Sequence, residues 1–207
     1  MSLDLTTGLV VSSLEIGRGD RRLFKGLSFQ LAAGQLALIT GPNGVGKTSL
    51  LRVLAGLGVA SAGSATWSGE PIHRGDPEVR SSVAYQGHLE GLCGDLTVAE
   101  NLDFYRDLWR QDEGSDALLR DLNLTNDADR RVRYLSAGQR RRVALGCMRI
   151  RYAKLWLLDE PFTNLDSAGS EVLADWLQAH TETGGAAVLA SHQSEWLKPF
   201  AAVEIEL

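Results

Sequence analysis

The N-terminal part of the chain contains three hydrophobic runs that predict strands. Apolar and polar positions alternate loosely over residues 9–16 and again over residues 27–31, with the sequence Gly-Arg-Gly-Asp between them. Two such runs joined by a turn are typical of an antiparallel pair. Residues 36–40 form a more continuous apolar run, as in a strand covered on both faces. We therefore expect an antiparallel N-terminal sheet followed by a buried strand.

The middle of the chain has the pattern of helices. Thr97-Val-Ala-Glu100 has the form of a capping box, which predicts a helix over residues 98–110. A second helix is expected over residues 115–122. Together they predict a helical insert in the chain.

Strands and helices alternate in the rest of the sequence. Helices are expected over residues 49–57 and 167–183, the latter closed by Gly184 and Gly185. The remaining strand candidates are residues 65–67, 82–85, 155–158, 186–190 and 202–207. This alternation implies an α/β fold with a mostly parallel sheet wrapped by helices.

A glycine-rich sequence, Gly-Pro-Asn-Gly-Val-Gly-Lys-Thr, lies between the strand 36–40 and the helix 49–57, which is the context of a P-loop. Only glycine lets backbone N–H groups approach a triphosphate so closely, and the helix dipole adds a fixed positive end. We expect Lys47 to reach the β- and γ-phosphates of ATP and Thr48 to place its hydroxyl on Mg²⁺, with Ser49 as a weaker candidate for this polar role. The predicted nucleotide-binding residues here are Gly41, Pro42, Asn43, Gly44, Val45, Gly46, Lys47, Thr48 and Ser49.

Two acids end the apolar strand 155–158. Ligands bind at the carboxyl ends of the strands in open α/β sheets, which is where Asp159 and Glu160 fall. We expect Asp159 to hold Mg²⁺ through water. Glu160, one residue further on, is expected to orient or deprotonate the attacking water.

A second candidate anion site precedes a helix expected over residues 140–150. Ser136 is a good N-cap, and Gly138 allows a close backbone approach, within the sequence Leu-Ser-Ala-Gly-Gln. Because the P-loop already has its own helix, we expect this second site to serve the nucleotide of another molecule. Its predicted nucleotide-binding residues are Ser136, Ala137, Gly138 and Gln139.

Composition narrows the possible partners. The net charge is −5 and the pI is about 5.4, so the chain lacks the basic footprint of a nucleic-acid binder. Cys93 and Cys147 have no metal-ligand spacing. No run of about 18 apolar residues is present, so we expect a soluble, cytoplasmic chain that meets a membrane only through a partner.

The motifs together resemble the ABC ATPase family over nearly the whole chain. The P-loop, the sequence 135–139, Asp-Glu-Pro at 159–161, Asn-Leu-Asp at 164–166 and Ser-His at 191–192 follow the order and spacing of that family. The resemblance implies a head-to-tail dimer in which ATP bridges the P-loop of one copy and Ser136 to Gln139 of the other. It also implies that His192 acts as a switch histidine near the γ-phosphate and that Asp166 belongs to a loop that crosses between subunits.

The resemblance further implies a P-loop ATPase core with an N-terminal antiparallel β subdomain and a helical insert. We expect one domain over residues 1–207. Its catalytic core would comprise about residues 1–86 and 151–207, and its helical lobe about residues 87–150.

Three positions depart from the family pattern. Ala137 stands where the family usually has glycine. By spacing, the position of the aromatic residue that stacks on adenine in the family falls near Arg18, whose guanidinium could stack instead. In the family, a glutamine links the Mg²⁺ site to the helical lobe. Counting along the sequence places that position at His88, whereas Gln86, two residues earlier, has the matching side chain. Both stay open, with Gln86 favoured as the catalytic residue.

Arginines crowd the second anion site, and two interpretations of them have equal weight. They form either a solvated face paired with nearby acids or a positive field that helps the second nucleotide site. The residues are Arg130, Arg131, Arg133, Arg140, Arg141 and Arg142.

Within the ABC family, several sequence segments resemble those of the ATP-binding subunits of bacterial cytochrome c maturation systems. They are residues 26–31, 87–88, 135–145, 159–163 and 191–193. The resemblance implies a peripheral subunit on the cytoplasmic face of the inner membrane, paired with an integral membrane subunit and driving a haem-handling or export step. None of the four histidines has a Cys-x-x-Cys-His context, so the chain itself shows no haem site.

Three alternatives remain. A transport ATPase for another cargo is the nearest, because the membrane partner chooses the cargo. A soluble ABC ATPase in assembly or repair would need tandem ATPase halves, a coiled-coil insertion or a basic surface, and none is visible. A binding module that holds ATP without turnover is opposed by Glu160.

Overall fold

The computed structural model describes residues 8–18, 21–74, 76–112, 114–192 and 197–207. Contacts divide the chain into two compact units. The first comprises the described parts of Met1–Gly87, Ala153–Pro161 and Ala179–Leu207, and the second comprises His88–Tyr152 and Phe162–Gln178. Residues 162–178 thus group with the helical unit, whereas the sequence boundary placed them with the core.

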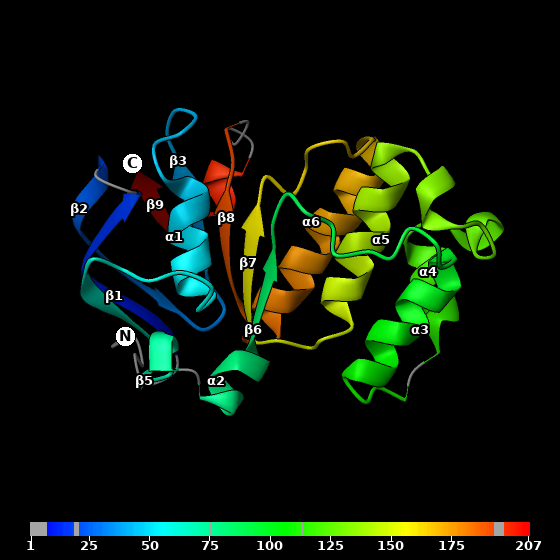
Figure 1. Ribbon diagram of the computed structural model, residues 1–207, viewed down its shortest axis with the longest axis horizontal. Helices are drawn as coiled ribbons and strands as arrows, with labels where there is room; N and C mark the ends of the chain where they lie inside the picture. The colour runs from blue at the N-terminus through cyan, green and yellow to red at the C-terminus, as the bar shows by residue number, and fades with distance from the viewer. Residues whose placement is uncertain (1–7, 19–20, 75, 113, 193–196) are drawn as a thin grey trace. The chain divides into compact units, whose positions relative to one another are not determined.

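The first unit contains an antiparallel sheet at its N-terminal end. Its strand order is β2-β1-β4-β5. Figure 1 draws β1 and β2 in blue. The strands are β1 (Gly8–Arg18), β2 (Arg21–Ala32), β4 (Ala62–Trp67) and β5 (Glu70–Pro71). The predicted antiparallel pair is confirmed. Both strands are longer than predicted because register shifts after Val11 and Leu14 interrupt the alternation without ending the pairing.

The same unit contains a five-stranded parallel sheet with the order β6-β7-β8-β3-β9. The strands are β3 (Leu36–Thr40), β6 (Val83–Gln86), β7 (Leu155–Asp159), β8 (Ala186–Ala190) and β9 (Val203–Glu206). Every residue of β7 and β8 is buried, as their continuous apolar sequences require. The predicted α/β fold is therefore confirmed.

Helix α1 (Lys47–Leu54) covers one face of the parallel sheet (Figure 1). Its leucines Leu50, Leu51 and Leu54 are fully buried in a core that also contains Leu157 and Val188. Burying a leucine side chain stabilises a fold by about 1.5–3 kcal/mol. This packing fixes the start of α1 beside the carboxyl ends of the strands.

The connection between β4 and β6 contains short elements that the sequence analysis missed. They are η1 (Ile72–Arg74) and α2 (Pro77–Ser82), which begins where Asp76 accepts a hydrogen bond from the Glu78 N–H at 2.8 Å. An aspartate followed by proline is a helix-start signal, and it was present in the sequence. A further short helix, η4 (Lys198–Phe200), precedes β9.

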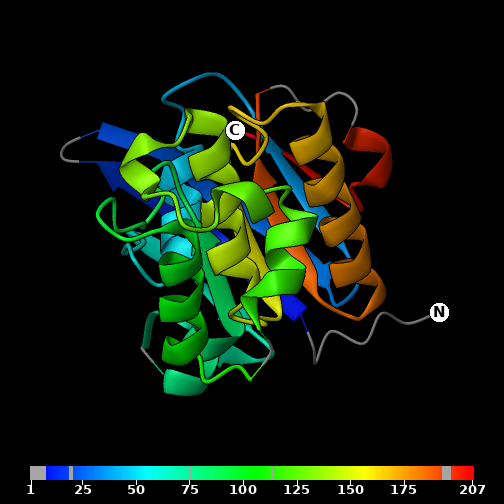
Figure 2. The ribbon, with the colours of Figure 1, turned by 90° about the vertical axis from the view of Figure 1, so that its right-hand side faces the viewer.

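The second unit is helical, and α3 packs against both α4 and α5 (Figures 1 and 2). Its elements are α3 (Val98–Leu108), α4 (Ser115–Asp121), η2 (Thr125–Asp127), η3 (Val132–Tyr134), α5 (Ala137–Arg149) and most of α6 (Ser167–Glu182). The predicted capping box is present, because Thr97 Oγ1 accepts from the Glu100 N–H and Glu100 Oε2 accepts from the Thr97 N–H. Cys147 packs in this unit, where burial raises the pKa of its thiol to about 12.

His180, near the end of α6, provides a test of the first unit's stability. Its ring stacks on Trp156 at 4.0 Å between centroids, and its Nε2 lies 3.2 Å from the Ala186 carbonyl oxygen. Burial lowers the pKa of His180 below 6.5. The folded state therefore binds fewer protons than the unfolded state at mildly acidic pH. We expect the free energy of unfolding to fall as the pH drops below about 6.5.

Denaturant unfolding between pH 5 and 8 measures this dependence. His180→Phe keeps a flat ring against Trp156 but cannot be protonated, so the slope below pH 6.5 should shrink. The exposed His73→Gln is the control for losing any one imidazole. An unchanged slope in His180→Phe would contradict the assignment.

Candidate active site

The P-loop contains three glycines with positive φ angles. The values are 134° at Gly41, 81° at Gly44 and 127° at Gly46. A Cβ atom at Gly41 would lie 2.6 Å from the Leu207 carbonyl oxygen, and one at Gly46 would lie 3.1 Å from the Phe24 ring. A Cβ at Gly44 would meet open space. Gly41 and Gly46 therefore let the loop pack closely, while Pro42, Asn43 and Gly44 form its exposed rim and Val45 lies half-buried behind it.

Lys47 begins α1 and turns back over this loop. Its Nζ donates hydrogen bonds to the carbonyl oxygens of Gly41 at 2.7 Å and Pro42 at 3.3 Å, and its side chain is buried. A positive charge is thus held within the loop at the N-terminal end of a helix, which is the arrangement that suits a bound phosphate.

Thr48 and Asp159 lie together although they are far apart in the sequence. The Thr48 hydroxyl donates to Asp159 Oδ2 at 2.6 Å, and Asp159 is 1% exposed at the end of β7. A hydroxyl and a carboxylate side by side are the oxygen ligands that Mg²⁺ takes, so these residues fit that ion. Within the described ranges, no three His, Cys, Asp or Glu side chains gather to hold a metal. Such a site suits an ion that arrives with phosphate oxygens and water.

Glu160 and His192 form a second pair in the same unit. Nδ1 of His192 lies 2.9 Å from Oε2 of Glu160, and the His192 backbone N–H donates to the same oxygen at 3.4 Å. Glu160 has a φ angle of 48°, which is unusual for a residue with a side chain, and its N–H donates to the Ala190 carbonyl oxygen at 2.9 Å. The adjacent strands β7 and β8 therefore bring these two predicted catalytic residues together.

Gln86 lies on the opposite side of the sheet from Asp159. It pairs in register with Leu158, whereas Tyr85 pairs with Leu157. Because side chains alternate along a strand, Tyr85 shares a face with Asp159 and Gln86 does not. Gln86 is buried, and its Nε2 donates to the Gly87 carbonyl oxygen at 3.2 Å. Its predicted catalytic contact with the Mg²⁺ site would therefore require it to leave this position, while His88 is exposed in the second unit.

Tyr85 shares a face of the sheet with Asp159, and the sequence analysis did not single it out. Burial raises the pKa of its phenol, the negative charge of Asp159 raises it further, and Arg52 acts in the opposite direction. Tyr85 therefore lies within electrostatic reach of the carboxylate at the end of β7. Only the register between β6 and β7 reveals this, so the local sequence carried no signal for it.

The predicted second anion site is at the start of α5 in the second unit. Ser136 Oγ accepts from the Gln139 N–H at 3.2 Å, and Gln139 Oε1 accepts from the Ser136 N–H at 2.9 Å. Gln139 also donates to Asp127 Oδ2 at 2.8 Å. Ser136 and Ala137 are exposed. This capping box starts the helix three residues earlier than predicted and leaves its first turn accessible.

The residues after the acidic pair pack beneath this helix start. A Cβ atom at Gly138 would lie 2.7 Å from the Asn164 carbonyl oxygen, so glycine is required there. Asp166 precedes α6, and its Oδ1 accepts from the Gly169 N–H at 2.9 Å. Asp166 itself is exposed. The side chain of Arg18, the predicted adenine-stacking group, lies outside the described residues.

Most of the arginines near Ser136 have acidic or carbonyl partners. Arg130 pairs with Asp127 at 3.3 Å, Arg140 pairs with Glu90 at 3.2 Å, and Arg133 pairs with Asp95. Arg142 donates to the Leu122 carbonyl oxygen at 2.9 Å, and Arg141 is buried. These contacts favour the interpretation as a paired, structural set over that of a free positive field.

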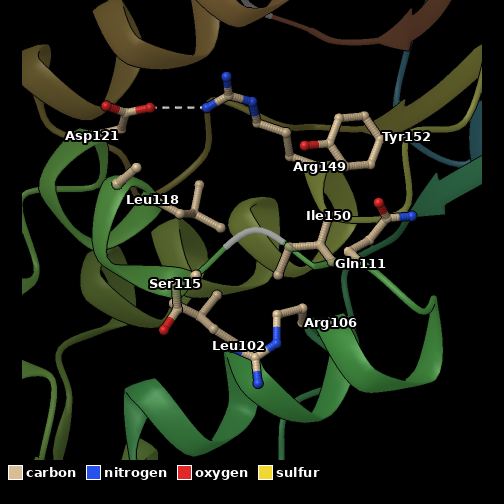
Figure 3. Close-up of a pocket in the computed structure, with 11 residues that line it drawn as sticks. Leu102, Arg106, Gln111, Ser115, Leu118, Asp121, Arg149, Ile150 and Tyr152 are labelled. Carbon is tan, nitrogen blue, oxygen red and sulfur yellow. Dashed lines mark hydrogen bonds and ion pairs between the residues drawn. The ribbon is translucent and has the colours of Figure 1, made fainter.

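A cavity of about 140 Å³ in the second unit contains none of the predicted site residues (Figure 3). Leu102, Leu118 and Ile150 contribute apolar surface. Its two arginines are both paired, Arg106 with Asp103 at 3.0 Å and Arg149 with Asp121 at 2.9 Å. We assign no ligand to it.

Comparison with known proteins identifies the family. The model of a family described as ABC transporter matches residues 24–163. The chain belongs to the ABC transporter family. It is an ATP-binding ATPase of this family, and its P-loop lies within the matched region.

Within the ABC family, the chain is similar to proteins named cytochrome c biogenesis ATP-binding export protein CcmA. It is 43% identical to CcmA 2 of Cupriavidus metallidurans over 189 residues, which cover 89% of this chain and 90% of that protein. It is 43% identical to CcmA of Escherichia coli O157:H7 over 187 residues, which cover 89% of each chain. The resemblance to the CcmA group of ABC ATPases is confirmed.

Solved structures agree with the fold of this ABC ATPase. An ATP-binding subunit of an ABC transporter has a TM-score of 0.88 at 22% identity, over 97% of this chain and 86% of that one. A putative ABC transporter ATP-binding protein from Pyrococcus furiosus has a TM-score of 0.83 at 20% identity, over 97% and 98% of the two chains. None of the helices in the described part of the chain combines the length and the hydrophobicity needed to span a bilayer.

Proposed function

We propose that this ABC ATPase energises a haem-handling or export step in c-type cytochrome biogenesis, as the peripheral subunit of a transporter in the bacterial inner membrane. The observation that carries the proposal is the 43% identity, over 89% of the chain, to a protein named for ATP-driven export in cytochrome c biogenesis. The absence of a membrane-spanning helix in the described residues is compatible with a separate integral membrane partner on whose cytoplasmic side the chain binds.

The nucleotide site of each copy would be built around residues 41–49. Their backbone N–H groups and the Lys47 ammonium would hold the phosphates of ATP, and Thr48 and Asp159 would hold Mg²⁺. The ion would neutralise charge that develops on the phosphate oxygens during hydrolysis. The 2.6 Å contact between Thr48 and Asp159 supports this assignment, because it already brings the two oxygen ligands together.

Glu160 would orient or deprotonate the attacking water, and His192 would hold the Glu160 carboxylate while facing the γ-phosphate. The 2.9 Å contact between them supports a joint role. The contact holds the carboxylate at the end of β7, where it could accept a proton from the attacking water. Gln86 is a weaker candidate than the sequence suggested, because it lies on the opposite face of β6 from Asp159.

Ser136, Ala137, Gly138 and Gln139 would close the nucleotide site of a second copy, with Asp166 near the contact between copies. The support is that Ser136 and Ala137 are exposed at the start of a 13-residue helix whose N-terminal end attracts anions. The functional dimer is therefore a head-to-tail pair of identical chains with two shared sites. Nucleic acid has no part in it.

Co-purification from membranes tests the biological role. The affinity tag belongs at the N-terminus, because the C-terminal Leu207 packs against Gly41 of the P-loop. We expect the tagged chain, extracted in mild detergent, to bring down an integral membrane protein of cytochrome c maturation. A tagged ATPase of an unrelated transporter from the same membranes is the control.

Recovery of a different transporter's membrane protein would favour another cargo. Recovery of soluble proteins alone would favour an assembly or repair ATPase. Either result would contradict the proposed role in cytochrome c biogenesis while leaving the ATPase assignment intact.

A further inference from the structure

Tyr85 stands on the face of β6 that points toward α1 and the P-loop side of the sheet. Its ring packs against the core that contains Leu50, Leu155 and Leu157. The ring is only partly buried, unlike those leucines. One end of the side chain is therefore anchored in the core while the other reaches the sheet edge where ligands bind.

The Tyr85 hydroxyl lies close to the point where the chain leaves the sheet. A Cβ atom at Gly87 would be only 2.7 Å from this oxygen, so the hydroxyl extends two residues up the strand toward the carboxyl edge. Among the described residues it makes no hydrogen bond, although Tyr105, on α3, donates to the Gly91 carbonyl oxygen at 2.7 Å. Because the Tyr85 oxygen is not one of the buried polar atoms that lack a partner in the described residues, it is open to solvent and accessible to a ligand.

Asp159, a residue of the predicted Mg²⁺ site, shares a face of the sheet with Tyr85. Tyr85 pairs with Leu157 in the parallel register, and Asp159 follows two residues later on the same face. The Tyr85 hydroxyl lies beside Gly87, two residues further along β6, so it is directed toward the same end of the sheet as Asp159. Asp159 in turn holds Thr48 at 2.6 Å.

We propose that the Tyr85 hydroxyl is a further nucleotide-binding group, which donates a hydrogen bond to an oxygen of the Mg²⁺–triphosphate group beside Asp159. That oxygen belongs either to a phosphate or to a water of the ion's shell. The inference rests on the proposed nucleotide site. It gives the solvent-accessible donor an acceptor, and the absence of a side chain at Gly87 leaves room for this hydroxyl.

The test is the dissociation constant of nucleotides for Tyr85→Phe, measured by calorimetry on the purified chain. Phenylalanine keeps the ring and its packing and removes only the hydroxyl. We expect ATP with Mg²⁺ to bind about tenfold more weakly, as for loss of one hydrogen bond to a charged group. Tyr152→Phe, at an exposed tyrosine of the second unit, is the matched control and should bind like the wild type.

Two further titrations identify the acceptor. If the acceptor is an oxygen of the terminal phosphate, the loss of affinity in Tyr85→Phe persists for ATP in EDTA and disappears for ADP with Mg²⁺. If the acceptor is a water molecule bound to Mg²⁺, the loss of affinity in Tyr85→Phe appears for both nucleotides with Mg²⁺ and disappears in EDTA. Both results support the proposal.

Equal affinities of Tyr85→Phe and the wild type in every titration would overturn the inference. A lower melting temperature without nucleotide, combined with unchanged affinities, would also overturn it by assigning Tyr85 a packing role alone. Gly87→Ala supplies a second variant, because its methyl group displaces the hydroxyl, and it should weaken binding with the same dependence on Mg²⁺. Failure of the wild type itself to bind ATP with Mg²⁺ would instead refute the proposed nucleotide site.

Discussion

Glu160→Gln is expected to lower steady-state ATP hydrolysis by about a hundredfold or more while leaving ATP affinity within about threefold of the wild type, the range of a lost general base. The amide keeps the size of the side chain and its contact with His192, but it cannot take a proton from water. Lys47 is held by the carbonyl oxygens of Gly41 and Pro42, and Thr48 is held by Asp159, so phosphate binding should survive the change at Glu160.

A second consequence of this variant is a change in association. If hydrolysis separates the two copies, a chain that binds ATP without hydrolysing it should accumulate as a dimer. Size-exclusion chromatography with light scattering, with and without ATP and Mg²⁺, measures this. Glu171→Gln, at an exposed glutamate of α6, is the control and should hydrolyse ATP and dissociate normally. Normal turnover by purified Glu160→Gln would refute its role as the base.

Short sequence patterns, such as apolar runs and helix caps, predicted several strands and helices correctly. The bounds of β3 and β8 agree with the sequence because every residue of these runs except Thr40 is apolar and the runs stop sharply. Thr97 starts α3 with the predicted capping box, a signal that spans only four residues. Ser136 is the predicted N-cap of α5, but the helix begins three residues earlier than expected. The short helix α2 was missed because six residues carry too little periodicity to stand out from a polar connection.

The relations within the site depend on strand order, which the sequence does not state. Glu160 meets His192 because β7 and β8 are neighbours, and they are separated by the whole of α6 in the chain. The positions of Gln86 and Tyr85 relative to Asp159 depend on a register between strands about seventy residues apart. A shift of one residue would exchange their faces, so chemistry alone favoured the glutamine.

The assignment of Ser136 to the nucleotide of a second copy gives the other large expected effect. Ser136→Arg should lower the rate of ATP hydrolysis by about a hundredfold or more, while the monomer still binds ATP with unchanged affinity. An arginine at this exposed N-cap would fill the space that a nucleotide of the partner copy needs, and it would also remove the capping hydroxyl. Ser136→Ala removes the cap without adding bulk, so it separates loss of the helix start from steric exclusion.

Mixing two inactive chains makes this prediction quantitative. Lys47→Ala should lose phosphate binding in its own P-loop but keep an intact Ser136, and Ser136→Arg has the opposite defect. In a head-to-tail pair, one mixed dimer contains one fully intact site and one doubly defective site. With random pairing, half of the dimers are mixed, so an equal mixture should recover about a quarter of wild-type hydrolysis if the sites act independently. Each chain alone should remain inactive. An inactive mixture in which light scattering detects dimers would contradict a pair of independent sites shared between the two copies.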